Sequence, residues 1–161
     1  MSVWTTMTSP LGALLLESDG DHLTSVLFEP WEPASGERDD AHPVLGEARA
    51  QLTAYFAGER RDFDLPLRAE GTEFQRRVWA QLRQIPYGST MSYGEVAGEL
   101  GLVPGASRAV GLANGRNPIS IIVPCHRVIG ADGSLTGYGG GIDRKRALLS
   151  LERDDEAAVL F

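Results

Sequence analysis

The chain has 161 residues, 42% hydrophobic and 23% charged, which indicates one or two folded domains and excludes a disordered or collagen-like chain. Its apolar runs are too short to span a membrane, and its start lacks a secretion-signal pattern, so we expect a cytoplasmic protein. The net charge of −7 opposes binding to nucleic acid, but it is unevenly distributed. Residues 1–66 hold 4 arginines against 12 acidic residues, whereas residues 67–150 hold 9 arginines and Lys145 against 6. This asymmetry is consistent with a basic half that meets a polyanion, although a random surface distribution would also produce it.

The first part of the chain favours a small sheet followed by a helix. Three runs of β-favouring residues predict an antiparallel meander, at residues 3–8, 13–17 and 22–28. The polar segment 29–40 contains proline and glycine, so we expect a loop there. Pro43 can open a helix, and apolar residues at helical spacing predict that it continues to Gly58. Residues 62–66 are expected to form an extended link.

The next part of the chain favours short helices. Two capping-box patterns predict helix N-termini, at Thr72 with Gln75 and at Ser92 with Glu95. The first of these helices ends before Pro86 and the second before Gly101. A further helix is predicted over residues 106–113. A helix, a tight break and a second helix are typical of a helix-turn-helix, a motif that also occurs in proteins that do not bind DNA.

The helix over residues 106–113 is composed mainly of small side chains. Arg108 is the one large polar side chain between Ala106 and Gly111. Small residues permit close packing between helices, and they equally permit close approach to a groove of DNA. Both interpretations remain open from the sequence.

The single cysteine follows an apolar run. Residues 121–123 predict a buried strand that Pro124 ends, and Cys125, His126 and Arg127 come next. A lone cysteine after such a run is more often a packed core residue than a nucleophile. A thiol becomes nucleophilic when a base or a positive field favours the thiolate, and His126 and Arg127 are the candidates for these two roles. One cysteine also excludes an intrachain disulfide.

A C-terminal helix that begins at Asp143 carries a candidate partner for His126. Glu152 lies on this helix, whose apolar side includes Leu148 and Leu151. It is either a solvated surface acid or the group that orients the histidine, and sequence spacing does not choose between these alternatives.

Residues 117–130 read Asn-Pro-Ile-Ser-Ile-Ile-Val-Pro-Cys-His-Arg-Val-Ile-Gly and resemble the active-site signature of the O6-alkylguanine-DNA alkyltransferases, or methylated-DNA–protein-cysteine methyltransferases, of bacterial type. Further similar motifs are Ser-Tyr-Gly-Glu at 92–95, Ser-Arg-Ala-Val-Gly at 107–111 and Gly-Tyr-Gly-Gly-Gly at 137–141. The resemblance is close over residues 71–152 and looser before them. It implies an α+β fold: a ribonuclease-H-like α/β domain over residues 1–66, packed on a helical DNA-binding and active-site domain over residues 67–161 with a helix-turn-helix.

The resemblance also implies an activity. The family transfers an alkyl group from O6-alkylguanine or O4-alkylthymine in double-stranded DNA to its own cysteine, irreversibly and once per molecule. The alkylated base is flipped out through the minor groove. No cofactor, membrane or obligate protein partner is implied. Some members hold a structural zinc in the N-terminal half, but no metal is expected in this chain because that half has no cysteine.

Four catalytic residues follow from the resemblance. Cys125 is the alkyl acceptor, and His126 deprotonates it through a water molecule. Glu152 orients His126, and Asn117 holds the chain around the active-site turn.

The residues that the resemblance implies for binding DNA and base form a second group, namely Arg76, Tyr93, Gly94, Arg108, Tyr138, Gly139 and Gly140. Arg108 takes the place of the flipped base in the stack, and Arg76 contacts a phosphate. Tyr93 lies near the base and helps to protonate the departing guanine. Tyr138, Gly139 and Gly140 form the pocket wall.

Two other classes of function remain open. One is a helix-turn-helix DNA-binding regulator in which Cys125 is a buried, non-catalytic residue. The other is a hydrolase that uses Cys125 and His126, which would turn over repeatedly through an acyl-enzyme.

Overall fold

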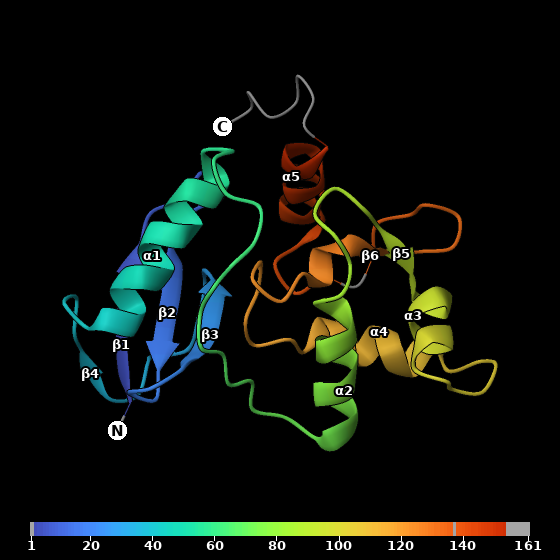
Figure 1. The fold of residues 1–161 in the computed structure, drawn as a ribbon, viewed down its shortest axis with the longest axis horizontal. Coiled ribbons are helices and arrows are strands. Elements are labelled where there is room, and N and C mark those ends of the chain that lie inside the picture. Colours follow the sequence, from blue (N-terminus) through green and yellow to red (C-terminus); the bar gives the residue numbers. More distant parts are fainter. Residues whose placement is uncertain (1, 137, 154–161) are drawn as a thin grey trace. The chain divides into compact units, whose positions relative to one another are not determined.

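The structure is a computed structural model that describes residues 2–136 and 138–153 (Figure 1). It divides into two compact units. The described part of the first unit comprises residues 2–70 and 118–120, and that of the second comprises residues 71–117, 121–136 and 138–153. Within these ranges no helix is long and apolar enough to cross a membrane.

The first unit is a four-stranded sheet with one helix against it. Strands β1 (Val3–Met7), β2 (Leu14–Ser18) and β3 (Leu23–Phe28) form an antiparallel meander, which confirms the prediction. Strand β4 (Glu37–Arg38) pairs in parallel with β1, so the strand order is β3-β2-β1-β4. Helix α1 (Pro43–Phe56) lies along the strands and contacts β1, β2 and β3 (Figure 1).

The predicted loop over residues 29–40 is wrong at its C-terminal end, where β4 forms. Glu37 donates its backbone N–H to the Ser2 carbonyl at 3.2 Å, and Asp39 donates to the Trp4 carbonyl at 2.9 Å. Both residues of β4 are exposed. A two-residue exposed strand has no alternating pattern, so nothing in its own sequence indicates it.

Strand β2 is the buried centre of the first unit. Leu14, Leu15 and Leu16 are fully buried although successive side chains of a strand point to opposite faces, so both faces of β2 are covered. Strand β3 lies beside β2 at the edge of the sheet, and its outer side pairs with residues 118–120. Val26 donates to the Pro118 carbonyl at 2.9 Å and accepts from the Ser120 N–H at 3.1 Å. The residues just before the cysteine motif are thereby fixed at a sheet edge.

The second unit is mainly helical. Its α-helices are α2 (Glu73–Leu82), α3 (Tyr93–Glu99), α4 (Ser107–Gly115) and α5 (Ile142–Glu152). Its remaining elements are the parallel pair β5 (Met91–Ser92) and β6 (Val128–Ile129) and the 3₁₀ helix η1 (Cys125–Arg127). Both predicted capping boxes are present, at the N-termini of α2 and α3. With the helical second unit, the sheet-bearing first unit gives the predicted α+β class.

The predicted strand over residues 121–123 is wrong. These residues are buried, but they form a turn in which Ile121 has a φ of 72°. A β-branched residue rarely adopts this left-handed conformation, so the surrounding structure must hold it there. The run is apolar because the turn lies in the interior, and burial alone explains its composition.

Helix α2 supports the helix pair α3–α4. The indole Nε1 of Trp79 donates to the carbonyl of Ala113 near the C-terminus of α4, at 2.8 Å. Arg77 donates to the carbonyl of Leu100 at the C-terminus of α3, at 3.2 Å. Helix α2 therefore holds the C-terminal ends of both α3 and α4.

We predict that Ser92→Ala lowers the free energy of unfolding by about 1 kcal/mol, because the hydroxyl of Ser92 accepts the N–H of Glu95 at the start of α3. Urea denaturation followed by circular dichroism measures this change. The matched control is Ser89→Ala at an exposed position, which should leave the midpoint unchanged. Equal midpoints for the Ser92 variant and the unmodified protein would show that the cap adds nothing.

Candidate active site

Cys125 is the first residue of η1 and is only 4% exposed. Its backbone N–H donates to the Val123 carbonyl at 2.8 Å, and its own carbonyl accepts from Nδ2 of Asn114 at 3.2 Å. Asn117 donates from Nδ2 to the Val123 carbonyl at 2.8 Å. Two asparagines, one in the last turn of α4 and one just after it, therefore hold the backbone of the cysteine turn. Asn117 was a predicted site residue and Asn114 was not.

Burial controls the chemistry of the thiol. It raises the pKa of Cys125 from 9.0 to about 11, against smaller opposing effects of a hydrogen bond from Asn117 and the positive charge of Lys145. The thiol is therefore protonated at neutral pH. A reaction through the thiolate needs a base that removes this proton in the site.

His126, Arg127 and Glu152 form a buried, hydrogen-bonded group. Nε2 of His126 lies 2.7 Å from Oε2 of Glu152, and both side chains are at most 1% exposed. Arg127 donates from Nε to Oε1 of Glu152 at 2.7 Å and from Nη2 to Oε2 at 3.0 Å. Its Nη1 donates to the Ile85 carbonyl at 2.7 Å. Glu152 is thus a buried side chain rather than a solvated surface acid.

The charges of this group set the tautomer of the histidine. Burial raises the pKa of Glu152, but His126 and Arg127 outweigh it and hold that pKa well below its ordinary value. Burial lowers the pKa of His126 despite the neighbouring carboxylate. A neutral His126 beside an ionised Glu152 donates its Nε2 proton, which leaves Nδ1 as the basic nitrogen. Nδ1 is buried and has no hydrogen-bond partner among the described residues.

The positive charge that favours the thiolate comes from Lys145 and not from Arg127, the candidate that the sequence suggests. The guanidinium of Arg127 is occupied by Glu152 and Ile85. Lys145 is fully buried in α5 and donates to the carbonyls of Val128 and Thr136. Burial lowers the pKa of Lys145 to about 8, so the ammonium is still mostly protonated at neutral pH.

Tyr93 and Lys145 both donate hydrogen bonds to the carbonyl of Thr136. The hydroxyl of Tyr93 donates to the Thr136 carbonyl at 2.8 Å, and Nζ of Lys145 lies 5.9 Å from the centre of the tyrosine ring. Partial burial raises the pKa of Tyr93, so the phenol remains protonated at neutral pH. Tyr93 is therefore a proton donor held next to the cysteine-bearing region.

A pocket of about 540 Å³ lies between the C-terminal part of α4 and the start of α5, lined by Gly111, Leu112, Gly115, Arg116, Tyr138, Gly139, Gly141 and Ile142. Two of the predicted wall residues, Tyr138 and Gly139, are among these. A Cβ atom on Gly139 would lie 3.4 Å from the Gly115 carbonyl oxygen, so there is little room for a side chain at this position. Gly140 is placed next to the pocket, where its carbonyl accepts from Nη1 of Arg144 at 3.3 Å.

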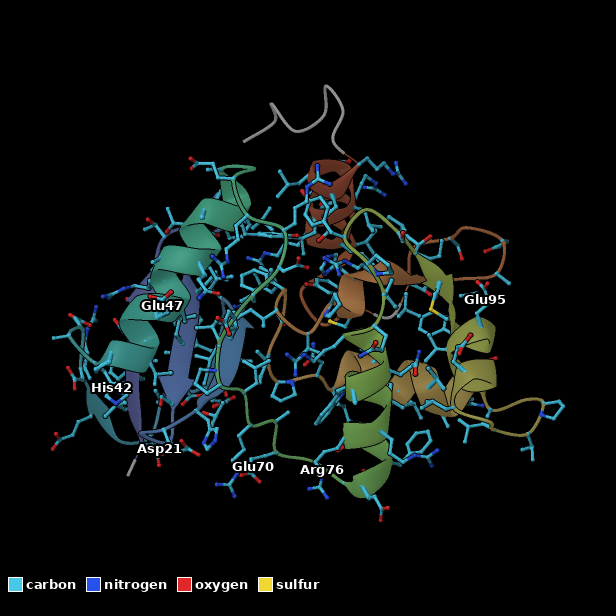
Figure 2. All side chains as sticks on the ribbon, viewed as in Figure 1. Asp21, His42, Glu47, Glu70, Arg76 and Glu95 are labelled. Atoms are coloured by element: carbon cyan, nitrogen blue, oxygen red, sulfur yellow. The ribbon has the colours of Figure 1, made fainter. Side chains whose placement is uncertain are left out.

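The remaining predicted residues lie on the helix pair or on the surface. Gly94 packs in the first turn of α3, where a Cβ atom would lie 3.5 Å from the Ser107 hydroxyl. Arg108 is exposed on α4. Leu112, one turn further along the same side of the helix, is 63% exposed. Arg76 is exposed near the start of α2 and points away from the helix (Figure 2). The structure does not bring Arg108 or Arg76 into the buried group around Cys125. Within the described residues, no cluster of three or more His, Cys, Asp or Glu could hold a metal ion.

Known proteins match both units of the chain. Residues 2–69 match the family described as 6-O-methylguanine DNA methyltransferase, ribonuclease-like domain, and residues 73–154 match the DNA binding domain of the same description. A Mycobacterium bovis methylated-DNA–protein-cysteine methyltransferase is 55% identical over 157 residues, covering 96% of this chain and 94% of that protein. The constitutive enzyme of that name from Bacillus subtilis is 45% identical over 160 residues, covering 95% and 96%. The crystal structure of Mycobacterium tuberculosis OGT in complex with DNA has a TM-score of 0.90 and 52% identity, with 99% of each chain covered.

We predict that the protein loses stability as the pH falls below the ordinary histidine pKa of 6.5, because the buried His126 resists protonation in the folded state and takes up a proton on unfolding. The unfolded state then binds more protons, so acid favours it. His126→Gln should show a smaller fall in melting temperature between pH 7 and pH 5.5. His42→Gln in the first unit is the control, and it should retain the full fall. Identical pH dependence in all three proteins would contradict this reading of the buried histidine.

Proposed function

This chain belongs to the 6-O-methylguanine DNA methyltransferase family, and we propose that it repairs DNA by moving an alkyl group from O6-alkylguanine to Cys125. The observation that carries the proposal is a buried thiol directly followed by a histidine whose far nitrogen is held by a carboxylate. The product is a thioether, which none of the side chains described around Cys125 has the chemistry to cleave. Each molecule therefore acts once. No cofactor is part of the proposal, because the acceptor is the protein's own thiol. O4-alkylthymine is a second substrate in this proposal.

Proton transfer begins the proposed reaction. Nδ1 of His126 takes the thiol proton through one water molecule, and Glu152 stabilises the resulting imidazolium through Nε2. The thiolate attacks the alkyl carbon, a carbon–sulfur bond forms, and the bond from that carbon to O6 breaks with its electrons moving to the purine. Tyr93 then supplies a proton to the departing guanine, and the imidazolium can replace it.

The other buried groups keep this machinery in place. Arg127 fixes Glu152 through two hydrogen bonds and so holds the carboxylate toward His126. Asn117 holds the Val123 carbonyl and lowers the energy of the thiolate by a hydrogen bond. Lys145 adds a positive charge to the same region. Burial of these groups strengthens each interaction because little solvent screens them.

DNA is the proposed partner, bound through its minor groove by the helix pair α3–α4. The exposed Arg108 replaces the flipped base in the stack, since small residues on either side let α4 approach the groove. Arg76 contacts a phosphate, and Gly94 permits the close approach of α3 to α4. Tyr138, Gly139 and Gly140 form the wall against which the extruded base rests.

Two further points belong to the proposal. An N-terminal domain over residues 1–66 serves as support, while a C-terminal domain over residues 67–161 carries the chemistry and the DNA contacts. The protein works in the cytoplasm, where the thiol stays reduced, and it needs no obligate protein partner.

Incubation with a duplex that contains O6-methylguanine should add the mass of one methyl group to the intact protein, located on Cys125 by peptide mapping. Cys125→Ser should show no gain because the acceptor sulfur is lost. One equivalent of DNA should be repaired per molecule of protein. Repair of many equivalents would contradict single use and favour a turnover mechanism, and an unmodified protein with intact DNA binding would favour the regulator.

Arg108→Ala should slow repair of duplex DNA by at least tenfold, since a flipped base that costs a few kcal/mol to extrude is no longer replaced in the stack. Its reaction with the free base O6-benzylguanine should stay within twofold of that of the unmodified protein, because no flipping is needed. Single-turnover rates on the two substrates measure the separation. Arg83→Ala, another exposed arginine of the second unit, is the control. Equal losses on both substrates would remove Arg108 from the flipping step.

A further inference from the structure

The connection between α2 and β5 contains a tight turn over residues 86–89, which packs beside α5 (Figure 1). Ser89 donates its backbone N–H to the Pro86 carbonyl at 3.0 Å, and Gly88, at the third position, has a φ of 82°. This conformation is typical of a type II turn, in which glycine is favoured at the third position. The turn therefore holds Tyr87 on a backbone of defined shape.

Tyr87 contacts the two segments that hold the buried carboxylate. Its hydroxyl donates to the carbonyl of Leu151, in the last turn of α5, at 3.3 Å. Carbonyls in the last turn of a helix lack a partner within the helix, so this bond caps α5 just before Glu152. Cζ of Arg127 lies over the tyrosine ring, 5.7 Å from its centre. One side chain thus touches both the helix end that carries Glu152 and the arginine that binds it.

The backbone on either side of Tyr87 contacts the same two segments. Before it, the carbonyl of Ile85 accepts from Nη1 of Arg127 at 2.7 Å. After it, a Cβ atom on Gly88 would lie 3.0 Å from the carbonyl oxygen of Glu152, so the turn lies directly against the end of α5. The contacts of Tyr87 are therefore part of a continuous surface and do not depend on one flexible side chain.

The ring of Tyr87 also suits the charge of Arg127. The side chain of Arg127 is 8% exposed, so little water surrounds its positive charge. The face of an aromatic ring is electron-rich and attracts a cation, most strongly where solvent is excluded. The guanidinium uses its N–H groups for Glu152 and Ile85. The ring adds a stabilising contact that leaves these hydrogen bonds in place.

We propose that Tyr87 is a positioning residue for alkyl transfer: its ring holds Arg127 and its hydroxyl holds the end of α5. Glu152 is thereby kept in line with Nε2 of His126. The inference rests on the proposed function, because it assigns a residue to that reaction. Tyr87 acts through Arg127 and Glu152 and not on the reacting atoms.

Loss of Tyr87 weakens the base in this account. Glu152 raises the pKa of His126 against the effect of burial. Two further charged groups, Arg127 and Lys145, lower that pKa. A carboxylate that is held less firmly raises the pKa of His126 less, so that pKa falls further below its ordinary value. The weaker base removes the thiol proton more slowly, and the pH at which its own protonation stops the reaction is lower.

The test compares Tyr87→Leu with Tyr87→Phe. Single-turnover transfer from the free base O6-benzylguanine is measured between pH 5 and pH 8, so that DNA binding plays no part. Tyr87→Leu should react about tenfold more slowly at neutral pH, as expected for partial loss of a positioned general base. The acid midpoint of its pH–rate profile should lie at lower pH than that of the unmodified protein. Tyr87→Phe keeps the ring over Arg127 and should stay within about threefold of the unmodified rate.

Phe74→Leu is the matched control, because it also replaces a partly buried aromatic side chain of the second unit by leucine. It should keep the rate and the midpoint of the unmodified protein. A purely structural role of Tyr87 would lower the active fraction by the same factor at every pH. An unshifted midpoint in Tyr87→Leu therefore overturns the inference, as does a Tyr87→Phe variant that is as slow as Tyr87→Leu.

A thermal melt shows which variants fold. If Tyr87→Leu does not fold, Tyr87→Met takes its place, since methionine fills a similar space without a ring. Failure of both variants to fold would make Tyr87 a structural residue and overturn the inference. Absence of transfer to the unmodified protein, from O6-benzylguanine and from duplex DNA with O6-methylguanine alike, overturns the proposed function itself.

Discussion

The second unit depends on one buried carboxylate. Glu152 keeps its negative charge where solvent hardly reaches it, because His126 and Arg127 hydrogen-bond both of its oxygens. Both partners come from η1, directly after Cys125, so this interaction fixes the end of α5 against the cysteine turn. Loss of Arg127 would leave an uncompensated charge in the interior, which is among the costliest changes a folded protein can undergo, and loss of His126 would remove a hydrogen bond from the same carboxylate. The same contacts that stabilise the unit therefore also align its candidate base.

Burial has opposite effects on the two reacting groups. It raises the pKa of Cys125 to about 11, which makes the thiol unreactive by itself. It lowers the pKa of His126, which keeps the imidazole neutral and able to accept a proton. A site with a preformed thiolate would need a much stronger positive field than Lys145 supplies against this burial. The arrangement thus favours a mechanism in which the proton leaves the sulfur only when the base and the substrate are both in place.

Local signals account for the parts of the fold that the sequence predicted well. The helices that begin at Thr72 and Ser92 carry capping boxes, whose hydrogen bonds involve residues three apart in the chain. The turn at 121–123 and the strand β4 depend on distant partners and on burial, which a short window of sequence does not reveal. A buried run of isoleucine and valine has the composition of a strand whether or not it pairs with another strand.

The candidate site shows the same division. Cys125 and His126 could be found from their adjacency and from the family resemblance, but spacing left Glu152 open because its partners come from another segment. In the sequence Lys145 stands between two arginines, a pattern that is typical of the solvent-exposed side of a helix. In the structure the side chain is buried and donates to the carbonyls of Val128 and Thr136. Asn114 gave no signal for the same reason, since its significance lies in a contact with Cys125, eleven residues further along the chain.

A protein that acts once needs a nucleophile that resists side reactions, because any other reaction of the thiol would inactivate the molecule. A protonated thiol that is 4% exposed reacts slowly with electrophiles from solution. In the proposed reaction the substrate overcomes this barrier, because the bound base expels water from the site and brings the alkyl carbon to the sulfur. Reactivity is then tied to recognition: the groups that bind the base also complete the environment in which the thiol can lose its proton. In this view the raised pKa of Cys125 protects a reagent that can be used only once, and it is compatible with catalysis because His126 lies next to it in the chain.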